Sequence, residues 1–315
     1  MSQPSFDVTV VIPTHNPHAG RLSRTLASLN AQSLDAGRWE TLLIDNGSEP
    51  AVDAAFLSQN APANLEVTRE ARIGLAWARR RGLTEARSPI AVFVDDDNLL
   101  APDYLEKVLK LFSQHPRVGA LGGRSLPEFE RAPAPWQREF LGLLALRDLG
   151  DASRIATGLR PPGSAIDEYP VDAAPIGAGM AIRVEAARAW LADGTSSVIS
   201  DRSGGSLSSG GDNDIAMSIM KDGWEVGYFP ELSLIHLIPG WRLDEDYLAR
   251  LNRGVQKSWM QVLSKHGANP WPPIPRWTVP LRQVKAWATY RAWSGAAARI
   301  RWQGACGHFE GRGTR

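Results

Sequence analysis

The stretch Ile90-Ala-Val-Phe-Val-Asp-Asp-Asp97 joins a run of apolar residues directly to three carboxylates. Two earlier stretches have the same layout, Val8-Thr-Val-Val-Ile-Pro-Thr-His-Asn16 and Thr41-Leu-Leu-Ile-Asp-Asn-Gly-Ser48. Short apolar, β-branched runs of this kind predict buried strands. Helices are expected between and after them, over residues 21–31, 74–85 and 102–113. This alternation predicts an α/β protein with right-handed crossovers and a mostly parallel sheet flanked by helices.

Polar residues follow three of these predicted strands. They are the turn Pro13, Thr14, His15 and Asn16, then Asp45, and then the run Asp95, Asp96 and Asp97. Ligands of parallel sheets bind beyond the carboxyl ends of the strands. We therefore expect the functional site at this edge of the sheet.

The second half of the chain departs from the regular alternation. Residues 124–169 are rich in Pro and Arg and predict one helix, over 136–149. A glycine-bearing strand is expected over 175–183, a helix over 212–221, and two strands over 225–229 and 232–236. Beyond Pro239 we expect a helix over 246–264, a Pro/Trp linker and a terminal helix over 281–302.

The composition indicates a soluble globular protein, with 43% hydrophobic and 22% charged residues among 315, enough for one large domain or two small ones. A net charge of +1 gives no general electrostatic reason to expect a nucleic-acid partner. The single cysteine, Cys306, excludes an internal disulfide framework and a Cys-based zinc site. Neither a signal peptide nor an apolar stretch of membrane-spanning length is evident, so we expect a cytoplasmic protein.

Three adjacent carboxylates at a strand end repel one another. Mg²⁺ or Mn²⁺ would relieve this repulsion, and such ions commonly bridge carboxylates to substrate phosphates. The alternative is a solvated acidic turn before the helix that begins near Pro102. Asp45 has two readings as well, since it either accepts a nucleobase N–H or closes the turn Asp45-Asn-Gly-Ser48.

Three further segments, taken with these stretches, resemble family 2 glycosyltransferases. They are Gly74-Leu-Ala-Trp-Ala-Arg-Arg-Arg-Gly82, Gly177-Ala-Gly-Met-Ala-Ile-Arg183 and residues 210–232, and the last matches the family segment without a gap. The resemblance covers about residues 7–240, with the motifs in the family's order. It implies a GT-A fold and transfer of one sugar, with inversion, from a nucleotide-diphosphate sugar. Residues 1–240 would form the catalytic domain, divided into a nucleotide-sugar half (1–123) and an acceptor half (124–240), and residues 241–315 a helical extension.

The resemblance also implies roles for individual residues. Asp212 stands where the family places the base that deprotonates the acceptor hydroxyl. Asp97, Asp95 and His236 are the candidate ligands for Mg²⁺ or Mn²⁺. The residues expected to bind the nucleotide are Pro13, Thr14, His15, Asn16, Asp45, Arg72, Arg79, Asp95 and Asp96. Trp136, Gly179 and Arg183 are the candidates for contact with the acceptor.

Some of these assignments have alternatives. Gly211 stands where the family usually has Glu, and a shifted alignment would make Asp214 the base instead of Asp212. Both aspartates also suit a helix N-terminus, where carboxylates are favoured. Arg72 replaces the Asn common in the family, and His236, on an apolar strand, is either a core residue or a metal ligand.

The C-terminal segment is basic and rich in tryptophan. Residues 271–315 contain eight Lys or Arg and one acid, Glu310, so their formal charge is +7. Interleaved basic and aromatic residues suit an anionic membrane surface, and the alternative is a helix packed on the catalytic domain. Gln283-Val-Lys-Ala-Trp287 lacks the spacing of the Q-x-x-R-W motif of processive synthases, which favours single addition.

The sequence thus predicts a metal-dependent, inverting glycosyltransferase that acts on a glycan or lipid-linked glycan acceptor in surface polysaccharide biosynthesis, with peripheral contact to the inner face of the cell membrane. A sugar nucleotidyltransferase is an alternative, although the glycine-rich phosphate loop expected near its N-terminus is not evident. A catalytically inactive glycan-binding or scaffold protein is a second alternative, suggested by Gly211.

Overall fold

A central β-sheet organises the molecule. The computed structural model describes residues 6–52, 57, 61–160, 167–193, 207 and 209–314. Within these residues, nine strands form one sheet in the order β3-β2-β1-β4-β8-β6-β9-β5, with β7 paired to β9. The strands are β1 (Val8–Thr14), β2 (Trp39–Asp45), β3 (Leu65–Arg69), β4 (Ile90–Phe93), β5 (Asn98–Leu100), β6 (Val118–Phe129), β7 (Arg154–Ala156), β8 (Ala181–Arg183) and β9 (Glu225–Ile238).

The first four neighbours in this order, β3, β2, β1 and β4, are parallel. The register pairs Thr14 with Asp45 and Val11 with Phe93, so the ends of β1, β2 and β4 lie at one edge of the sheet. Strand β8 then runs antiparallel to β4, while the long strands β6 and β9 run parallel to each other. The mostly parallel sheet expected from the sequence is therefore confirmed.

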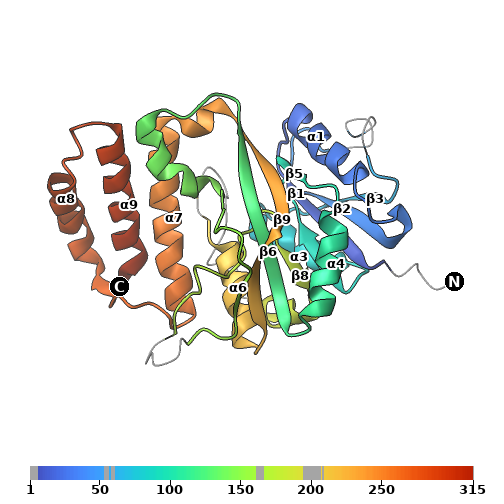
Figure 1. The fold of residues 1–315 in the computed structure, drawn as a ribbon. Helices are drawn as coiled ribbons and strands as arrows, with labels where there is room; N and C mark the ends of the chain where they lie inside the picture. Colours follow the sequence, from blue (N-terminus) through green and yellow to red (C-terminus); the bar gives the residue numbers. More distant parts are fainter. Residues whose placement is uncertain are drawn as a thin grey trace.

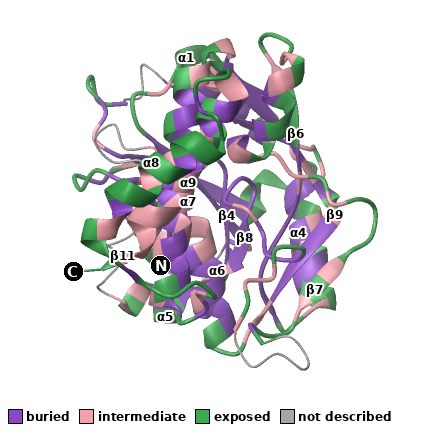
Figure 2. Cartoon of the chain, turned by 90° about the vertical axis from the view of Figure 1, so that its left-hand side faces the viewer, coloured by how far each residue is buried: buried purple, intermediate pink, exposed green. Residues whose placement is uncertain are grey.

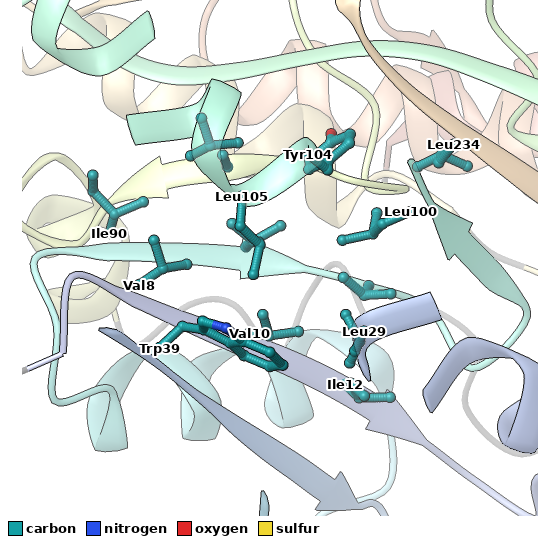
Figure 3. Packing of buried hydrophobic residues seen from close by; sticks show 14 of the residues in the cluster. Val8, Val10, Ile12, Leu29, Trp39, Ile90, Leu100, Tyr104, Leu105 and Leu234 are labelled. Carbon is teal, nitrogen blue, oxygen red and sulfur yellow. The ribbon is translucent and has the colours of Figure 1, made fainter. Parts of the chain in front are cut away.

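Helices cover both faces of the sheet (Figure 1). On one face, Val8, Val10 and Ile12 of β1 pack in a cluster with α1 (Ala19–Asn30) and α4 (Tyr104–Gln114). Figure 3 shows Val10 and Ile12 near Leu29 of α1, with Val8 further back along β1. On the other face, Val11 packs in a second cluster with α3 (Leu75–Glu85) and α6 (Gly211–Lys221). Successive side chains of a strand point to opposite faces, so alternate residues of β1 enter the two clusters. The sheet is therefore the middle of three layers, with helices on either side.

The C-terminal residues form a helical layer beyond the sheet. It contains α7 (Glu245–Lys265), α8 (Val279–Thr289) and α9 (Ala296–Arg312), and α8 is the outermost of the three (Figure 1). The shorter elements of the chain are η1 (Ala36–Arg38), η2 (Pro135–Leu144), η3 (Val184–Ala187), α5 (Arg188–Ala192), η5 (Gly240–Leu243), η6 (Arg276–Thr278), β10 (Ile274–Pro275) and β11 (Gly313–Thr314). Among the helices in the described part of the chain, none is both long and apolar enough to cross a bilayer.

Several predicted elements differ from those observed. The two strands expected over 225–229 and 232–236 form one strand, β9, which bulges between them. Gly122 of β6 pairs with Tyr228, but Arg124 already pairs with Ser233. A Cβ at Gly123 would lie 2.0 Å from the Leu232 carbonyl oxygen, so only glycine fits beside this bulge. The terminal helix expected over 281–302 is two helices, since Arg291 (φ 51°) and Gly295 (φ 147°) turn the chain between α8 and α9.

Candidate functional site

A cavity of about 300 Å³ lies at the carboxyl edge of the parallel strands. The end of β1, the turn after β4 and the start of α3 contribute to its lining, and η5, which follows β9, adds Trp241 and Arg242. The lining residues are Pro13, Thr14, His15, Asn16, Pro17, His18, Arg21, Asn46, Leu75, Ala78, Asp95, Asp96, Asp97, Trp241 and Arg242. The structure thus brings the predicted turn after β1 and the predicted aspartate run to one cavity.

Asn46 holds the loops around this cavity in place. Its buried side-chain amide donates to the carbonyl oxygens of Glu70 (3.1 Å) and Arg72 (2.8 Å) and accepts from the Gly74 amide (2.7 Å). His15 Nδ1 lies 2.8 Å from the Asn46 carbonyl oxygen, so the turn after β1 is tied to the same residue. A buried amide with all these partners stabilises a defined loop geometry. From the sequence alone, Asn46 is expected only as part of the turn Asp45-Asn-Gly-Ser48.

Each carboxylate of the aspartate run has a different partner. Asp96 accepts a hydrogen bond from the Thr14 hydroxyl, and Asp95 Oδ1 lies 3.8 Å from Arg79 Nη2. Burial raises the pKa of Asp96 to about 6, and the negative charge of Asp97 adds to this effect. Asp97 is 3% exposed and pairs through Oδ2 with Arg242 Nη2 at 3.0 Å. Two arginines therefore already relieve part of the repulsion expected from the sequence.

His236 completes the buried group around Asp97. Its Nε2 lies 3.3 Å from Asp97 Oδ1 and 3.1 Å from Arg242 Nη1. A guanidinium can only donate, so His236 Nε2 is the acceptor in its contact with Arg242 and carries a lone pair there. Across the described residues, no three His, Cys, Asp or Glu side chains form a ready set of metal ligands.

The two candidate bases differ sharply in their surroundings. Asp212, at the start of α6, is half-buried and accepts hydrogen bonds from the Gly177 and Asn213 amides, both at 2.9 Å. Asp214 is 2% exposed and accepts from Trp190 Nε1 (2.9 Å), with Lys265 Nζ and His266 Nε2 each 2.8 Å from its Oδ1.

The pKa of Asp214 reflects this difference. Burial raises it, but the hydrogen bonds from His266 and Lys265 outweigh burial and hold the pKa below its ordinary value. Asp214 is thus a buried, paired anion that joins α6 to the end of α7.

Arg79 connects the aspartate run to Asp212. This buried side chain lies between Asp95 and Gly177, because a Cβ at Gly177 would fall 2.3 Å from Arg79 Nη2. Gly177 in turn donates its amide to Asp212. One continuous set of contacts therefore runs from the cavity to the candidate base.

Two residues expected at the nucleotide have other partners. The Asp45 carboxylate is buried and accepts from the Ser48 amide (2.9 Å) and the Val52 amide (3.4 Å), which is the turn-closing alternative. Arg72 pairs with Glu70 at 2.8 Å and lies over the Trp77 ring. The structure does not bring either side chain into the lining of the cavity.

The three acceptor candidates are also apart from the cavity lining. Arg183 pairs in register with Ile90, at the opposite end of β4, and donates to the carbonyl oxygens of Phe112 and Val118. Gly179 has φ of 74° and accepts from the Tyr104 hydroxyl, so it serves a turn. Trp136 is half-buried against the apolar cluster beside α7.

Sequence reasoning missed Trp241 and Arg242, which line the cavity from η5. Arg242 is six residues beyond His236, on the turn Pro239-Gly-Trp-Arg242 that follows β9. A basic residue just after a predicted strand-end histidine is the signal that could have marked it.

The fold is that of GT-A glycosyltransferases, and comparisons with known proteins agree. The S. aureus TarS structure has a TM-score of 0.52 at 12% identity, covering 96% of this chain and 89% of that one. The mannosyltransferase PcManGT from Pyrobaculum calidifontis, in complex with GDP-Man and Mn²⁺, has a TM-score of 0.52 at 19% identity, covering 96% and 75%. Neighbours at this level of identity show the GT-A fold.

The family model for glycosyl transferase family 2 matches residues 9–186, and the chain belongs to this family. Succinoglycan biosynthesis protein ExoW of Rhizobium meliloti is 37% identical over 102 residues, 31% of each chain. Validoxylamine A glucosyltransferase of Streptomyces hygroscopicus subsp. jinggangensis is 28% identical over 166 residues, 51% of this chain and 39% of that one. An uncharacterized glycosyltransferase of Bacillus subtilis, YfnE, is 37% identical over 103 residues, 32% of this chain and 26% of that one. The matches thus span well under half of each relative's length.

Proposed function

We propose that this chain is an inverting glycosyltransferase. It moves a single sugar from a nucleotide-diphosphate sugar to a glycan or lipid-linked glycan acceptor in surface polysaccharide biosynthesis. The observation that carries this proposal is the continuous set of contacts from the aspartate-lined cavity through Arg79 to Asp212. The relatives support it, since one is named for succinoglycan biosynthesis and a structural neighbour is a mannosyltransferase in complex with GDP-Man.

Asp212 acts as the base in this proposal. Its carboxylate removes the proton of the acceptor hydroxyl as that oxygen attacks the anomeric carbon of the donor. The bond from that carbon to the diphosphate breaks on the opposite face, and the electron pair leaves with the phosphate oxygen. Inversion follows from this single displacement, as in inverting glycosidases. Asp214 is unsuited to the role because it is buried and already paired with Lys265 and His266.

The donor lies in the cavity, with its nucleoside near the turn after β1 and its diphosphate near Arg242. The guanidinium of Arg242 offers donors that fit phosphate oxygens. Arg79, held beside Asp95, supplies a second positive charge on the side of Asp212. Residues 1–123, together with Arg242 of η5, would hold the donor, and residues 124–240 the acceptor.

A divalent cation, Mg²⁺ or Mn²⁺, fits the residues present. Asp97 offers a carboxylate and His236, on β9, a lone pair on Nε2, only 3.3 Å apart, and Asp95 lies on the same turn as Asp97. Such ions are often held by one or two carboxylates, with the remaining positions taken by substrate phosphates and water. When bound, the cation would neutralise charge on the departing diphosphate. Arg242 would then have to release Asp97 and turn toward the phosphates.

A donor-binding screen tests the proposal. The protein is melted with UDP-, GDP- and dTDP-sugars, each with Mn²⁺ and with EDTA. One donor at about 100 times its dissociation constant should stabilise the fold by about 2.7 kcal/mol, which is roughly 5 °C. Asp97→Ala is the matched variant, and its shift should be largely lost in Mn²⁺. If no donor raises the melting temperature of the folded protein, the glycosyltransferase proposal fails in favour of a scaffold.

A further inference from the structure

The outer face of α8 exposes apolar side chains where other helices of the protein bury them. Trp277, one turn before α8, is 74% exposed, and Leu281 and Val284 are 65% and 67% exposed. Further along, Trp287, Tyr290 and Trp293 are also exposed, and the rings of Trp287 and Trp293 lie with centroids 4.5 Å apart. Isolated exposed apolar residues are ordinary, but a contiguous group of this size marks an interaction surface.

Helix geometry places this group on the side of α8 that points away from the protein. The buried residues of α8 are Val279 and Ala286, which are two turns apart on its inner face. At about 100° per residue, Leu281, Val284 and Ala288 lie on the opposite face. Figure 1 shows α8 at the margin of the molecule, with α9 between it and α7, and Figure 2 shows that the exposed colour covers most of α8.

The charges around this face have one sign. Arg276, Arg282, Lys285 and Arg291 are all exposed, and the sequence from 271 to 309 contains no Asp or Glu. Glu310, the one acid of the C-terminal segment, faces inward, where it pairs with Arg253 and accepts from Gln283. The surface therefore combines Trp, Leu and Val with four cations for which the described part of the chain shows no ion pair.

We propose that the outer face of α8, from Trp277 to Trp293, docks the protein on an anionic lipid bilayer. The helix would lie in the plane of the interface, with Leu281 and Val284 toward the acyl chains and the basic side chains among the headgroups. Indole rings favour this interfacial depth, and each basic residue near an anionic surface adds to the affinity. A second copy of the chain is a poorer occupant, because the same four cations would meet themselves across a two-fold contact.

The two alternatives left open for the C-terminal segment fit different helices. Helix α9 packs against α7, with Ile300 and Cys306 buried, so it is a packed helix of the protein. Helix α8 is the part that remains available to a membrane. A docking surface of this kind would bring the protein to a lipid-linked acceptor, and that link rests on the proposed function. Lipid binding itself can be measured without donor or acceptor.

Vesicle co-sedimentation tests the proposal. The full chain is mixed with phosphatidylcholine vesicles that contain or lack phosphatidylglycerol. We expect binding to the anionic vesicles that weakens as salt is raised. The triple variant Trp277→Ser/Leu281→Ser/Val284→Ser should bind at least tenfold more weakly. The matched control is Val171→Ser, a substitution of another exposed apolar residue, and it should bind like the wild type.

A second variant tests the charges separately. Arg282→Gln/Lys285→Gln should lose roughly tenfold or more of its affinity for anionic vesicles, with little change on neutral ones. Melting curves should show that all variants fold like the wild type. The proposal is overturned if the wild type stays in the supernatant, if the triple variant still binds, or if sedimentation velocity shows a wild-type dimer that the triple variant abolishes. A protein that binds vesicles but none of the donors would keep this surface and lose the proposed activity.

Discussion

Replacing the carboxylate of Asp212 by an amide should lower the rate of sugar transfer far more than the free energy of unfolding. In Asp212→Asn the side chain keeps its size, and its remaining oxygen still accepts from one of the two amides that the carboxylate now binds, those of Gly177 and Asn213. The other amide then faces an NH₂ group. We expect this loss to lower the free energy of unfolding by about 1–2 kcal/mol.

The effect on the rate should be much larger. A positioned general base contributes about 10²–10⁴-fold, so the barrier to sugar transfer should rise by about 3–5 kcal/mol. Donor binding should change little, because Asp212 lies outside the lining of the cavity. If Asp212 merely stabilised the start of α6, the same substitution would change the melting temperature and leave the rate per folded molecule intact.

The assay follows release of the nucleotide from the donor identified in the binding screen, with acceptor present, while calorimetry follows donor binding. Asp214→Asn is the control, because it is two residues away on the same helix. It should lower stability by about 1–3 kcal/mol, since the buried Trp190 and His266 lose their anion, whereas Lys265 keeps its ion pair with Asp193 at 2.8 Å. Its rate per folded molecule should stay within about tenfold of the wild type. A transfer rate in Asp212→Asn within tenfold of the wild type would refute the assignment of the base.

Three further predictions follow from the contacts of the site. Arg242→Ala should weaken binding of a nucleoside diphosphate by roughly tenfold. It should strengthen binding of Mn²⁺, because the guanidinium no longer competes for Asp97. Calorimetry with each probe tests this, and weaker Mn²⁺ binding would contradict it. Gly177→Ala should displace the buried Arg79, lowering stability by about 1–3 kcal/mol and transfer at least tenfold, as melting and rate measurements would show. The lowered pKa of Asp214 means that its contribution to stability is present above about pH 4 and is lost as the pH falls through the native pKa. A pH series of unfolding curves should therefore be flatter for Asp214→Asn, and parallel curves would count against the buried pair.

The sheet could be predicted from the sequence where local pattern decides the structure. Val8 to Ile12 and Ile90 to Val94 are apolar enough to be buried whatever their neighbours are, and polar residues mark where each strand ends. The continuity of β9 could not be predicted in this way. Pro230 reads as a break between two strands, but the residues between Tyr228 and Ser233 bulge out of β9, and they do so beside Gly123 of the partner strand, which is distant in the sequence.

The residues of the site also fall into those that local sequence pattern predicts and those that it does not. The turn after β1 and the aspartate run could be predicted because each directly follows a strand of the parallel sheet. Arg242 could not, because its pairing with Asp97 depends on where β9 ends in space. The choice between Asp212 and Asp214 is similar, since only packing shows which carboxylate meets Lys265. Spacing along a helix leaves that choice open.

The ion pair between Asp214 and Lys265 also bears on how this protein can be divided. Lys265 ends α7, and nearby Met260, Val262 and Leu263 are buried in the same apolar cluster as α6. The helix that carries the proposed base is thus fastened to residues that lie beyond position 240. A chain shortened at that position would lose this support, and we expect it to expose part of its core and to hold Asp212 loosely. The C-terminal helices thus stabilise the catalytic half of the molecule. A chimera made with a relative would therefore have to exchange α6 and α7 together.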